Sequence, residues 1–221
     1  MKSVTMIAIL ACCLLTSVSA TAQPAVAYAA GEIEFNYTGS GGYSESFHAV
    51  GPAGGAGEFI LPEEAEGCGG LTGNTPDVHF FMASGAVRNP DSSQDIVVMV
   101  IYSDTESITN GSYPINPYDF SSIVLYLDDV TDFVYPEDTT ELDWNAILGS
   151  VVAAHKFISF TGMITLGEIN SGIANGTFSG SMSDMAIPPT IIPVENGTFA
   201  LTGGLVSADQ ASFSELKSMF R

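Results

Sequence analysis

The sequence predicts an all-β fold, with an antiparallel β-sandwich as the first choice and a β-barrel as the alternative. Short apolar or alternating segments recur along the chain, and turn-forming Gly, Pro and Asn residues separate them. Strands and helices do not alternate regularly, as a parallel doubly wound sheet would require. We therefore expect one β-rich domain over residues 32–221, with one or two short helices at most.

Residues 1–22 have the layout of a secretory signal peptide. Lys2 precedes an apolar stretch at residues 6–15, and small residues follow up to Ala22. A membrane-spanning helix needs about 20 apolar residues, and this stretch is much shorter. We expect cleavage after Ala20 or Ala22, which makes the protein secreted or periplasmic.

Lipoprotein anchoring through Cys12 or Cys13 is the alternative to cleavage, although the apolar stretch before Cys12 is short for such a signal. Residues 23–31 are small and rich in alanine, with no alternation of apolar and polar residues. They are expected to form a disordered leader ahead of the domain.

Alternation marks the first strand of the domain. Ile33, Phe35 and Tyr37 alternate with polar residues, which is typical of a strand with one buried and one solvated face. Residues 96–102 are apolar throughout and predict a buried strand, joined to the preceding strand as an antiparallel hairpin by a turn at residues 88–93. The first half is expected to contain strands at residues 32–37, 44–50, 58–61, 78–84 and 95–103, and an exposed loop at 62–76.

The second half continues the pattern. Residues 140–154 combine a helix-like start with strand-favouring valines, so both conformations stay open. Phe213, Leu216 and Phe220 recur at helical spacing and predict a short closing helix. We expect a short extended piece at residues 111–115 and strands at 122–127, 156–166, 173–182 and 198–206.

The charge of the chain excludes several classes of partner. It has 25 acidic and 5 basic residues, and its formal net charge is −20. Nucleic acids and anionic membrane surfaces are disfavoured, because both are bound through clustered Lys and Arg. Solubility outside the cell explains such acidity, and cation binding is the second interpretation.

Cysteine usage predicts neither a disulfide framework nor a zinc site. Once residues 1–22 are removed, Cys68 is the last cysteine, and both kinds of site need partners. No set of His and Cys residues suits zinc or copper. Cys68 lies among glycines, so it is expected to be an incidental free thiol in a flexible loop.

No catalytic constellation is visible. Nucleophilic hydrolysis needs a serine or cysteine beside a base, and the three histidines, His48, His79 and His155, are not accompanied by a Gly-x-Ser-x-Gly motif. His79 is expected to be an ordinary strand residue. Paired carboxylates could serve a hydrolase, but 25 acidic residues do not single out one pair. We assign no catalytic residue, and no cofactor other than calcium.

Calcium binding is the chemistry that the sequence favours most. Asn89, Asp91, Ser93 and Asp95 offer oxygen ligands at alternate positions of a turn, as in the first half of a calcium loop. An EF-hand is excluded, because Val100 occupies the twelfth position, where that motif needs a glutamate.

A second acidic segment is the alternative calcium site. It carries Asp128, Asp129 and Asp132, and it continues as an acidic connector to Asp143. For both segments, solvated charge without a metal is the competing interpretation.

One four-residue sequence occurs twice. Residues 175–178 and 196–199 both read Asn-Gly-Thr-Phe, and Asn-Gly tolerates positive φ, so each copy is expected to be a turn or bulge that leads into a strand. Together with Gly-Ser-Tyr-Pro-Ile at residues 111–115 and the strand at 157–166, these motifs resemble bacterial exported or lipoprotein β-domains of unknown function. The resemblance covers residues 110–205 and brings no catalytic residues with it.

These observations predict a non-catalytic exported β-domain that acts by surface interaction with a carbohydrate, a protein or a component of the cell envelope. The alternatives are a secreted carboxylate-dependent hydrolase and a calcium-dependent structural or adhesion component.

Overall fold

A computed structural model of the chain describes residues 26–38, 44–52, 67–74, 79–116, 118, 121–133, 149, 151–184 and 186–205. Its strands are, in chain order, β1 (Val26–Thr38), β2 (Ser44–Pro52), β3 (Gly67–Asn74), β4 (His79–Arg88), β5 (Gln94–Ser103), β6 (Gly111–Pro114), β7 (Ser122–Val130), β8 (Asp132–Phe133), β9 (Val151–Val152), β10 (His155–Ile169), β11 (Ile173–Ser183) and β12 (Ile191–Leu205). Helical backbone occurs within the described ranges at Gly149 alone, so the all-β prediction is confirmed. No helix in this part of the chain is long and apolar enough to cross a membrane.

The long strands form one sheet that closes on itself. Neighbouring strands follow the order β11-β12-β1-β2-β3-β4-β5-β7-β10-β6, and additional pairings join β10 to β11 and β1 to β3. The closed ring therefore runs through β1, β3, β4, β5, β7, β10, β11 and β12, with β2 and β6 as added strands. Its pairings are antiparallel. The architecture is the β-barrel that was the alternative prediction, and the sandwich is not confirmed.

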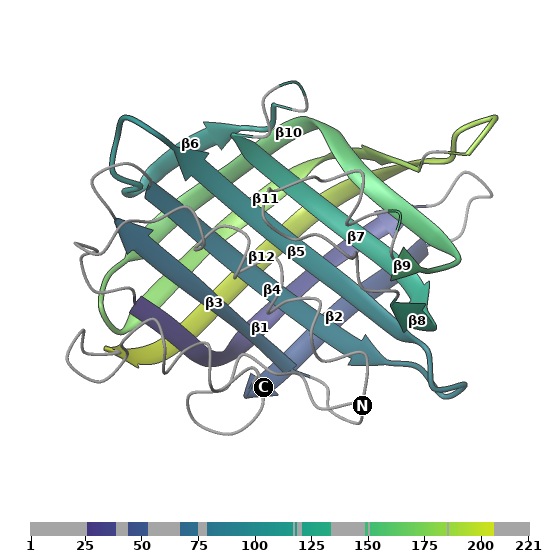
Figure 1. The fold of residues 1–221 in the computed structure, drawn as a ribbon, viewed down its shortest axis with the longest axis horizontal. Helices are drawn as coiled ribbons and strands as arrows, with labels where there is room; N and C mark the ends of the chain where they lie inside the picture. The colour runs from purple at the N-terminus through teal and green to yellow at the C-terminus, as the bar shows by residue number, and fades with distance from the viewer. Residues whose placement is uncertain are drawn as a thin grey trace.

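The strands of the barrel lie in two crossing layers, which explains why the strand pattern also suits a sandwich. In Figure 1, β3, β4, β5 and β7 form the layer of strands nearest the viewer and cross over β1, β2, β11 and β12 behind them. A sandwich would leave the edges of both layers free. Here β1 pairs with β3 through residues 26–28 and 70–72, and β7 pairs with β10 through residues 125–128 and 155–158. Hydrophobic periodicity does not encode these long-range pairings.

The first strand begins earlier than expected. β1 starts at Val26, so the prediction of a disordered leader over residues 23–31 is wrong for its described part. Tyr28 is fully buried, and its hydroxyl donates to the carbonyl of Asn170 at 2.7 Å. Small residues are needed here because a Cβ on Gly31 would lie 2.3 Å from the carbonyl oxygen of Ala200 on β12. From residue 32 onward, the predicted alternation of exposed and buried residues is confirmed.

A second correction concerns residues 62–76, which were predicted to be an exposed loop. β3 occupies Gly67–Asn74, and Cys68 is buried within it instead of lying in a flexible loop. Glycine disfavours strands in general, but here it permits close packing. A Cβ on Gly73 would lie 2.6 Å from the ring of Phe80, which occupies the space on the neighbouring strand.

The other predicted strands are found with small shifts in their ends, except that the strand predicted at 198–206 begins seven residues earlier. β4 and β5 form the predicted antiparallel hairpin, β12 begins at Ile191, and the strands expected at 44–50, 122–127, 156–166 and 173–182 lie within β2, β7, β10 and β11. Residues 58–61, most of 140–154 and the predicted closing helix lie outside the described residues.

Aromatic side chains fill the interior of the barrel. The ring centroid of Phe35 lies 5.1 Å from that of Phe47, 5.4 Å from that of Tyr126 and 5.6 Å from that of Phe178. All four side chains are buried and come from β1, β2, β7 and β11, so these contacts join the two layers. Such rings each bury a large apolar area, and their offset and edge-to-face contacts add to the stability. The interior is therefore a packed core.

Candidate functional site

The β4–β5 turn and the end of β7 meet at one end of the barrel. The ladder between β5 and β7 is regular up to the pair of Ile96 with Leu127, and beyond it Asp128 and Asp129 both lie opposite Asp95. Two residues facing one is a β-bulge, and Asp129 has the positive φ of 52°. The bulge therefore brings three aspartates from two strands together.

We call Asp95, Asp128 and Asp129 the acidic cluster. One carboxylate oxygen of each lies within 4.8 Å of the others. The side-chain amide of Asn89 donates to Asp95 Oδ1 at 2.9 Å and to Asp129 Oδ1 at 3.0 Å. The Ser93 hydroxyl lies 2.8 Å from Asp129 Oδ1, and the backbone N–H of Asp129 donates to Asp95 Oδ1 at 3.0 Å. These bonds orient the carboxylate oxygens.

The structure joins parts of the two predicted calcium sites. Asn89, Ser93 and Asp95 come from the first site, and Asp128 and Asp129 come from the second. The sequence presented them as alternatives because nothing in it places the β4–β5 turn beside the end of β7.

Two of the predicted ligands have other positions. Asp91 Oδ1 accepts hydrogen bonds from the backbone N–H of Ser93 at 3.0 Å and from its hydroxyl at 2.7 Å, and these bonds lower the pKa of Asp91. Asp91 therefore shapes the turn and is not a member of the acidic cluster. Asp132 lies in β8, where its backbone pairs with Val152, and its side chain is outside the described part of the structure.

Burial and mutual repulsion change the protonation of the acidic cluster. The pKa of Asp128 is raised to about 6. Burial is the largest cause, and the negative charges of Asp95 and Asp129 also contribute. Burial also raises the pKa of Asp95, partly offset by the hydrogen bonds from Asp129 and Asn89. Above a pH of about 6 the Asp128 carboxyl is mainly ionised, and its repulsion by the neighbouring negative charges favours the binding of a cation.

Sequence analysis missed three residues beside the acidic cluster. Glu45 contributes a negative charge that raises the pKa of both Asp95 and Asp128. The Tyr37 hydroxyl donates to the Glu45 carboxylate and lies 3.2 Å from the hydroxyl of Tyr126. Burial raises the pKa of both tyrosines, so they stay neutral. Only the β1–β2 register, which pairs Tyr37 with Glu45, brings Glu45 here, and no sequence motif signals it.

A histidine borders the acidic cluster on β10. His155 pairs across the strands with Asp128, and its Nδ1 lies 3.1 Å from Asp184 Oδ2. Asp184 also accepts the backbone N–H of Thr190 at 2.7 Å, so it anchors the turn that leads into β12. This His–Asp pair therefore has a structural role in the turn.

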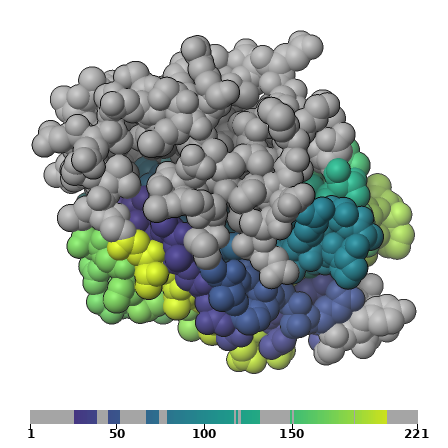
Figure 2. Space-filling model, turned by 90° about the horizontal axis from the view of Figure 1, so that it is seen from below, coloured from purple at the N-terminus to yellow at the C-terminus, as the bar shows by residue number. Residues whose placement is uncertain are grey.

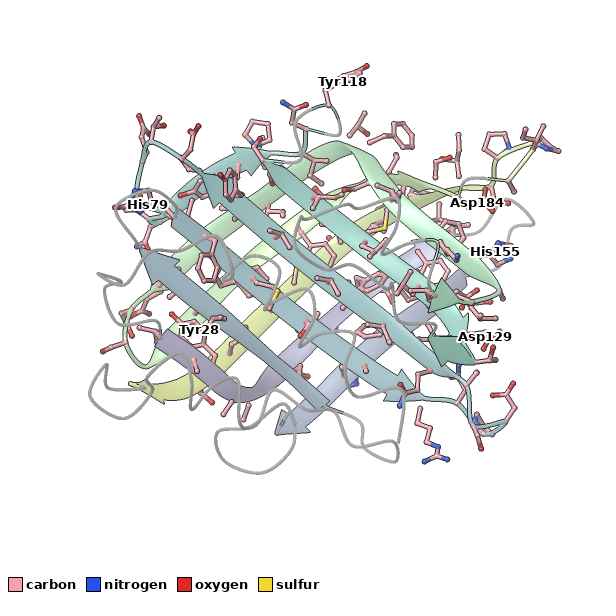
Figure 3. All side chains as sticks on the ribbon, in the orientation of Figure 1. Tyr28, His79, Tyr118, Asp129, His155 and Asp184 are labelled. Carbon is pink, nitrogen blue, oxygen red and sulfur yellow. The ribbon has the colours of Figure 1, made fainter. Side chains whose placement is uncertain are left out.

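The labelled side chains of Figure 3 show how these groups are distributed. Asp129, His155 and Asp184 lie toward one end of the barrel, and His79 lies toward the opposite end. His79 belongs to β4, as the sequence predicted, and it is remote from the acidic cluster.

No family model, curated protein or solved structure matches this chain. The candidate function therefore rests on geometry, and the resemblance to bacterial exported β-domains stays a prediction.

A second group of metal-ligating side chains lies on the exposed face of β1 and β2. Glu34 pairs across the strands with His48, whose Nε2 lies 2.7 Å from Glu32 Oε1, and one ligand atom of each lies within 4.8 Å of the others. Zinc accepts histidine and carboxylate ligands, although the sequence predicted no zinc site. All three residues are exposed, and such groups are common without an ion, so the partly buried acidic cluster is the stronger candidate.

Proposed function

We propose that this chain is a non-catalytic exported β-domain that binds its partner at its surface. The observation that carries the proposal is the aromatic packing around Phe35 and Tyr126, which fills the space that ligand-carrying barrels leave open. The partner classes are a carbohydrate, a protein or a component of the cell envelope. The net charge of −20 disfavours nucleic acids and anionic membranes.

Binding screens with the chain from residue 23 onward test this proposal. Arrayed glycans and cell-envelope fractions are the probes, and a panel of chromogenic hydrolase substrates runs in parallel. We expect saturable binding to a glycan or an envelope component, without turnover of any substrate. Blank binding screens together with substrate turnover would overturn the proposal.

We propose further that the acidic cluster takes a calcium ion that stabilises this end of the barrel. Calcium prefers six to eight oxygen ligands, and Asp95, Asp128 and Asp129 supply carboxylate oxygens within 4.8 Å of one another. Water would complete the shell. A bound cation would relieve the repulsion that contributes to the raised pKa of Asp128.

Thermal unfolding with and without calcium tests the second proposal. CaCl2 should raise Tm relative to NaCl at equal ionic strength, and saturation at about 100 times Kd corresponds to about 2.7 kcal/mol. Asp95→Asn and Asp129→Asn should lose this increment. Asp91→Asn is the matched control and should keep it, because Asp91 lies outside the acidic cluster. An increment that a chelator leaves unchanged, or that all variants share, would contradict the calcium site.

The carboxylate-dependent hydrolase draws on the same residues. A carboxyl group with a pKa of about 6, as in Asp128, is suited to general acid catalysis near neutral pH. If the substrate panel responds, Asp128→Asn should abolish turnover, and Asp91→Asn should preserve it. Turnover that survives Asp128→Asn would exclude the acidic cluster as its source.

A further inference from the structure

The outer face of β1 and β2 brings two glutamates and a histidine together. Glu34 lies directly opposite His48 in the β1–β2 register, and Glu32 lies two residues away from Glu34, on the same face of β1. The Cβ atoms of directly opposite residues are about 5 Å apart, and those of diagonal neighbours are about 7–8 Å apart. Glutamate and histidine side chains can span both distances. The register therefore directs three metal-ligating side chains to one point.

The ligand atoms of these side chains are close to the spacing that zinc requires. His48 Nε2 lies 2.7 Å from Glu32 Oε1, and one ligand atom of each of the three side chains lies within 4.8 Å of the other two. A tetrahedral zinc ion with bonds of about 2.1 Å holds its ligand atoms about 3.4 Å apart. The side chains of Glu32 and His48 are each 52% exposed, so they can rotate to reach this spacing while the backbone keeps its position.

The backbone that carries these ligands is held on both sides. Glu34 of β1 lies between Thr198 of β12 and His48 of β2. The neighbours of Glu34 in the chain, Ile33 and Phe35, are buried in the core and fix the strand from below. The Thr198 hydroxyl also donates to Glu34 Oε1 at 3.3 Å, so the next strand orients this carboxylate. Ligands on paired strands are positioned more precisely than ligands on loops.

An ion can reach these ligands directly from solvent. Figure 2 shows β1 in purple and β12 in yellow side by side at the surface of the molecule, as their pairing requires. Glu32, Glu34 and His48 are all exposed. Three protein ligands leave the fourth position of a tetrahedral ion to water. A metal ion could therefore bind here without any opening of the barrel.

We propose that Glu32, Glu34 and His48 bind a zinc ion on the outer face of β1 and β2. The imidazole decides the class of metal, because calcium takes oxygen ligands, whereas zinc accepts histidine nitrogen together with carboxylate oxygen. The divalent charge also offsets the repulsion between two carboxylates that lie two residues apart on one strand. The zinc site shares no residue with the acidic cluster, so it does not depend on the calcium proposal.

Isothermal titration with zinc tests this site in the chain from residue 23 onward, which contains every described strand. The protein carries no histidine tag, and excess CaCl2 is present throughout. We expect one zinc ion per chain, and binding that is weaker by at least about tenfold in Glu34→Gln and in His48→Ala. Glu195→Gln is the matched control and should leave the affinity unchanged, because it removes an exposed carboxylate of β12 that does not belong to the site.

A second set of titrations separates the zinc site from the acidic cluster. Asp95→Asn should keep the zinc affinity of the parent chain, whether or not it loses the response to calcium. Zinc binding that Asp95→Asn removes, or that calcium displaces, would assign the ion to the acidic cluster and overturn the proposal. The absence of zinc binding, equal affinity in the parent chain and in His48→Ala, or one zinc ion per two chains would overturn it as well.

Chemical modification of the parent chain gives a readout that needs no variant. Diethylpyrocarbonate acylates accessible imidazole nitrogens, and mass spectrometry identifies the modified histidines. Saturating zinc should slow the modification of His48 several-fold, because the ion occupies its Nε2. His155 is the internal control, since its side chain is 45% exposed and its Nδ1 lies beside Asp184, and zinc should leave its rate unchanged. An unchanged rate at His48, or protection of His155 in its place, would overturn the proposal.

Discussion

Asp128 is the side chain whose protonation is coupled most clearly to folding. Its pKa is raised to about 6 in the folded chain, so the folded state binds a proton more tightly than the unfolded state does. The resulting stability is fully present below about pH 4 and is lost as pH rises through 6. In the absence of calcium, Asp128 therefore destabilises the barrel at neutral pH.

The substitution Asp128→Asn should remove the loss of stability that accompanies ionisation of this side chain. With allowance for solvent screening of a half-exposed group, we expect the free energy of unfolding at pH 7 to rise by about 1–2 kcal/mol, with little change at pH 4. Urea denaturation at both pH values, in the presence of chelator, measures the difference. Asp91→Asn is the control and should show no such gain, since hydrogen bonds lower the pKa of Asp91. An equal effect at both pH values would refute the assignment to protonation.

Cys68 is a second side chain whose chemistry depends on its position. Burial in β3 raises the pKa of its thiol to about 12 and leaves it 1% exposed. Thiolate is the reactive form, so both effects suppress reaction. In the chain from residue 23 onward, we expect a thiol reagent such as DTNB to label Cys68 only upon unfolding, at a rate that follows urea concentration. Rapid labelling of the native chain at pH 8 would contradict the burial of this thiol.

Among the strands, β11 and β12 explain the repeated Asn-Gly-Thr-Phe. The two copies pair with each other: Thr177 lies opposite Thr198, Gly176 opposite Phe199 and Phe178 opposite Gly197. A Cβ on Gly176 would lie 2.6 Å from the Phe199 ring, and a Cβ on Gly197 would lie 2.7 Å from the Phe178 ring. Each glycine thus makes room for the phenylalanine of the other copy, and both rings enter the core.

Substitution of these glycines should weaken the β11–β12 pairing. In Gly176→Ala, the new Cβ would also lie 2.1 Å from the Thr165 carbonyl oxygen on β10, so two neighbouring strands must shift. We expect a loss of about 3 kcal/mol, at the upper end for overpacked sites, measured by urea denaturation. Gly149→Ala is the matched control, because its Cβ would meet no atom within 4 Å, and its stability should be nearly unchanged. Equal stability of the two variants would show that the close approach at Gly176 is not tight.

Across the entire chain, the net charge of −20 opposes compact folding at low ionic strength. Raising NaCl from about 0.01 M to 0.15 M shortens the Debye length from about 30 Å to about 8 Å, so it screens repulsion between distant carboxylates. We expect Tm to rise over this range in Asp95→Asn as well as in the parent chain, because the effect does not depend on the acidic cluster. Calcium at the same ionic strength should add a further rise in the parent chain alone. A Tm that does not respond to NaCl would show that the acidic residues are too far apart to repel one another significantly.

Local patterns in the sequence were sufficient for the all-β class and for most strands. Alternation placed the exposed and buried residues from Ile33 to Tyr37, and the continuous apolar run at residues 96–102 correctly marked a strand buried on both faces. The same reasoning failed at Gly67–Asn74, because close packing against Phe80 outweighs the low strand propensity of glycine there.

Closure into a barrel and assembly of the acidic cluster depend on contacts between distant segments. The pairing of β1 with β3 joins the two layers at one edge, and a single bulge places Asp128 and Asp129 opposite Asp95. Sequence analysis identified aspartates at these positions as members of two separate candidate sites, and no motif indicated that Glu45 lies beside them. Register and bulges follow from how whole strands pair in space, so residue types along one segment define which side chains are available, and folding defines which of them meet.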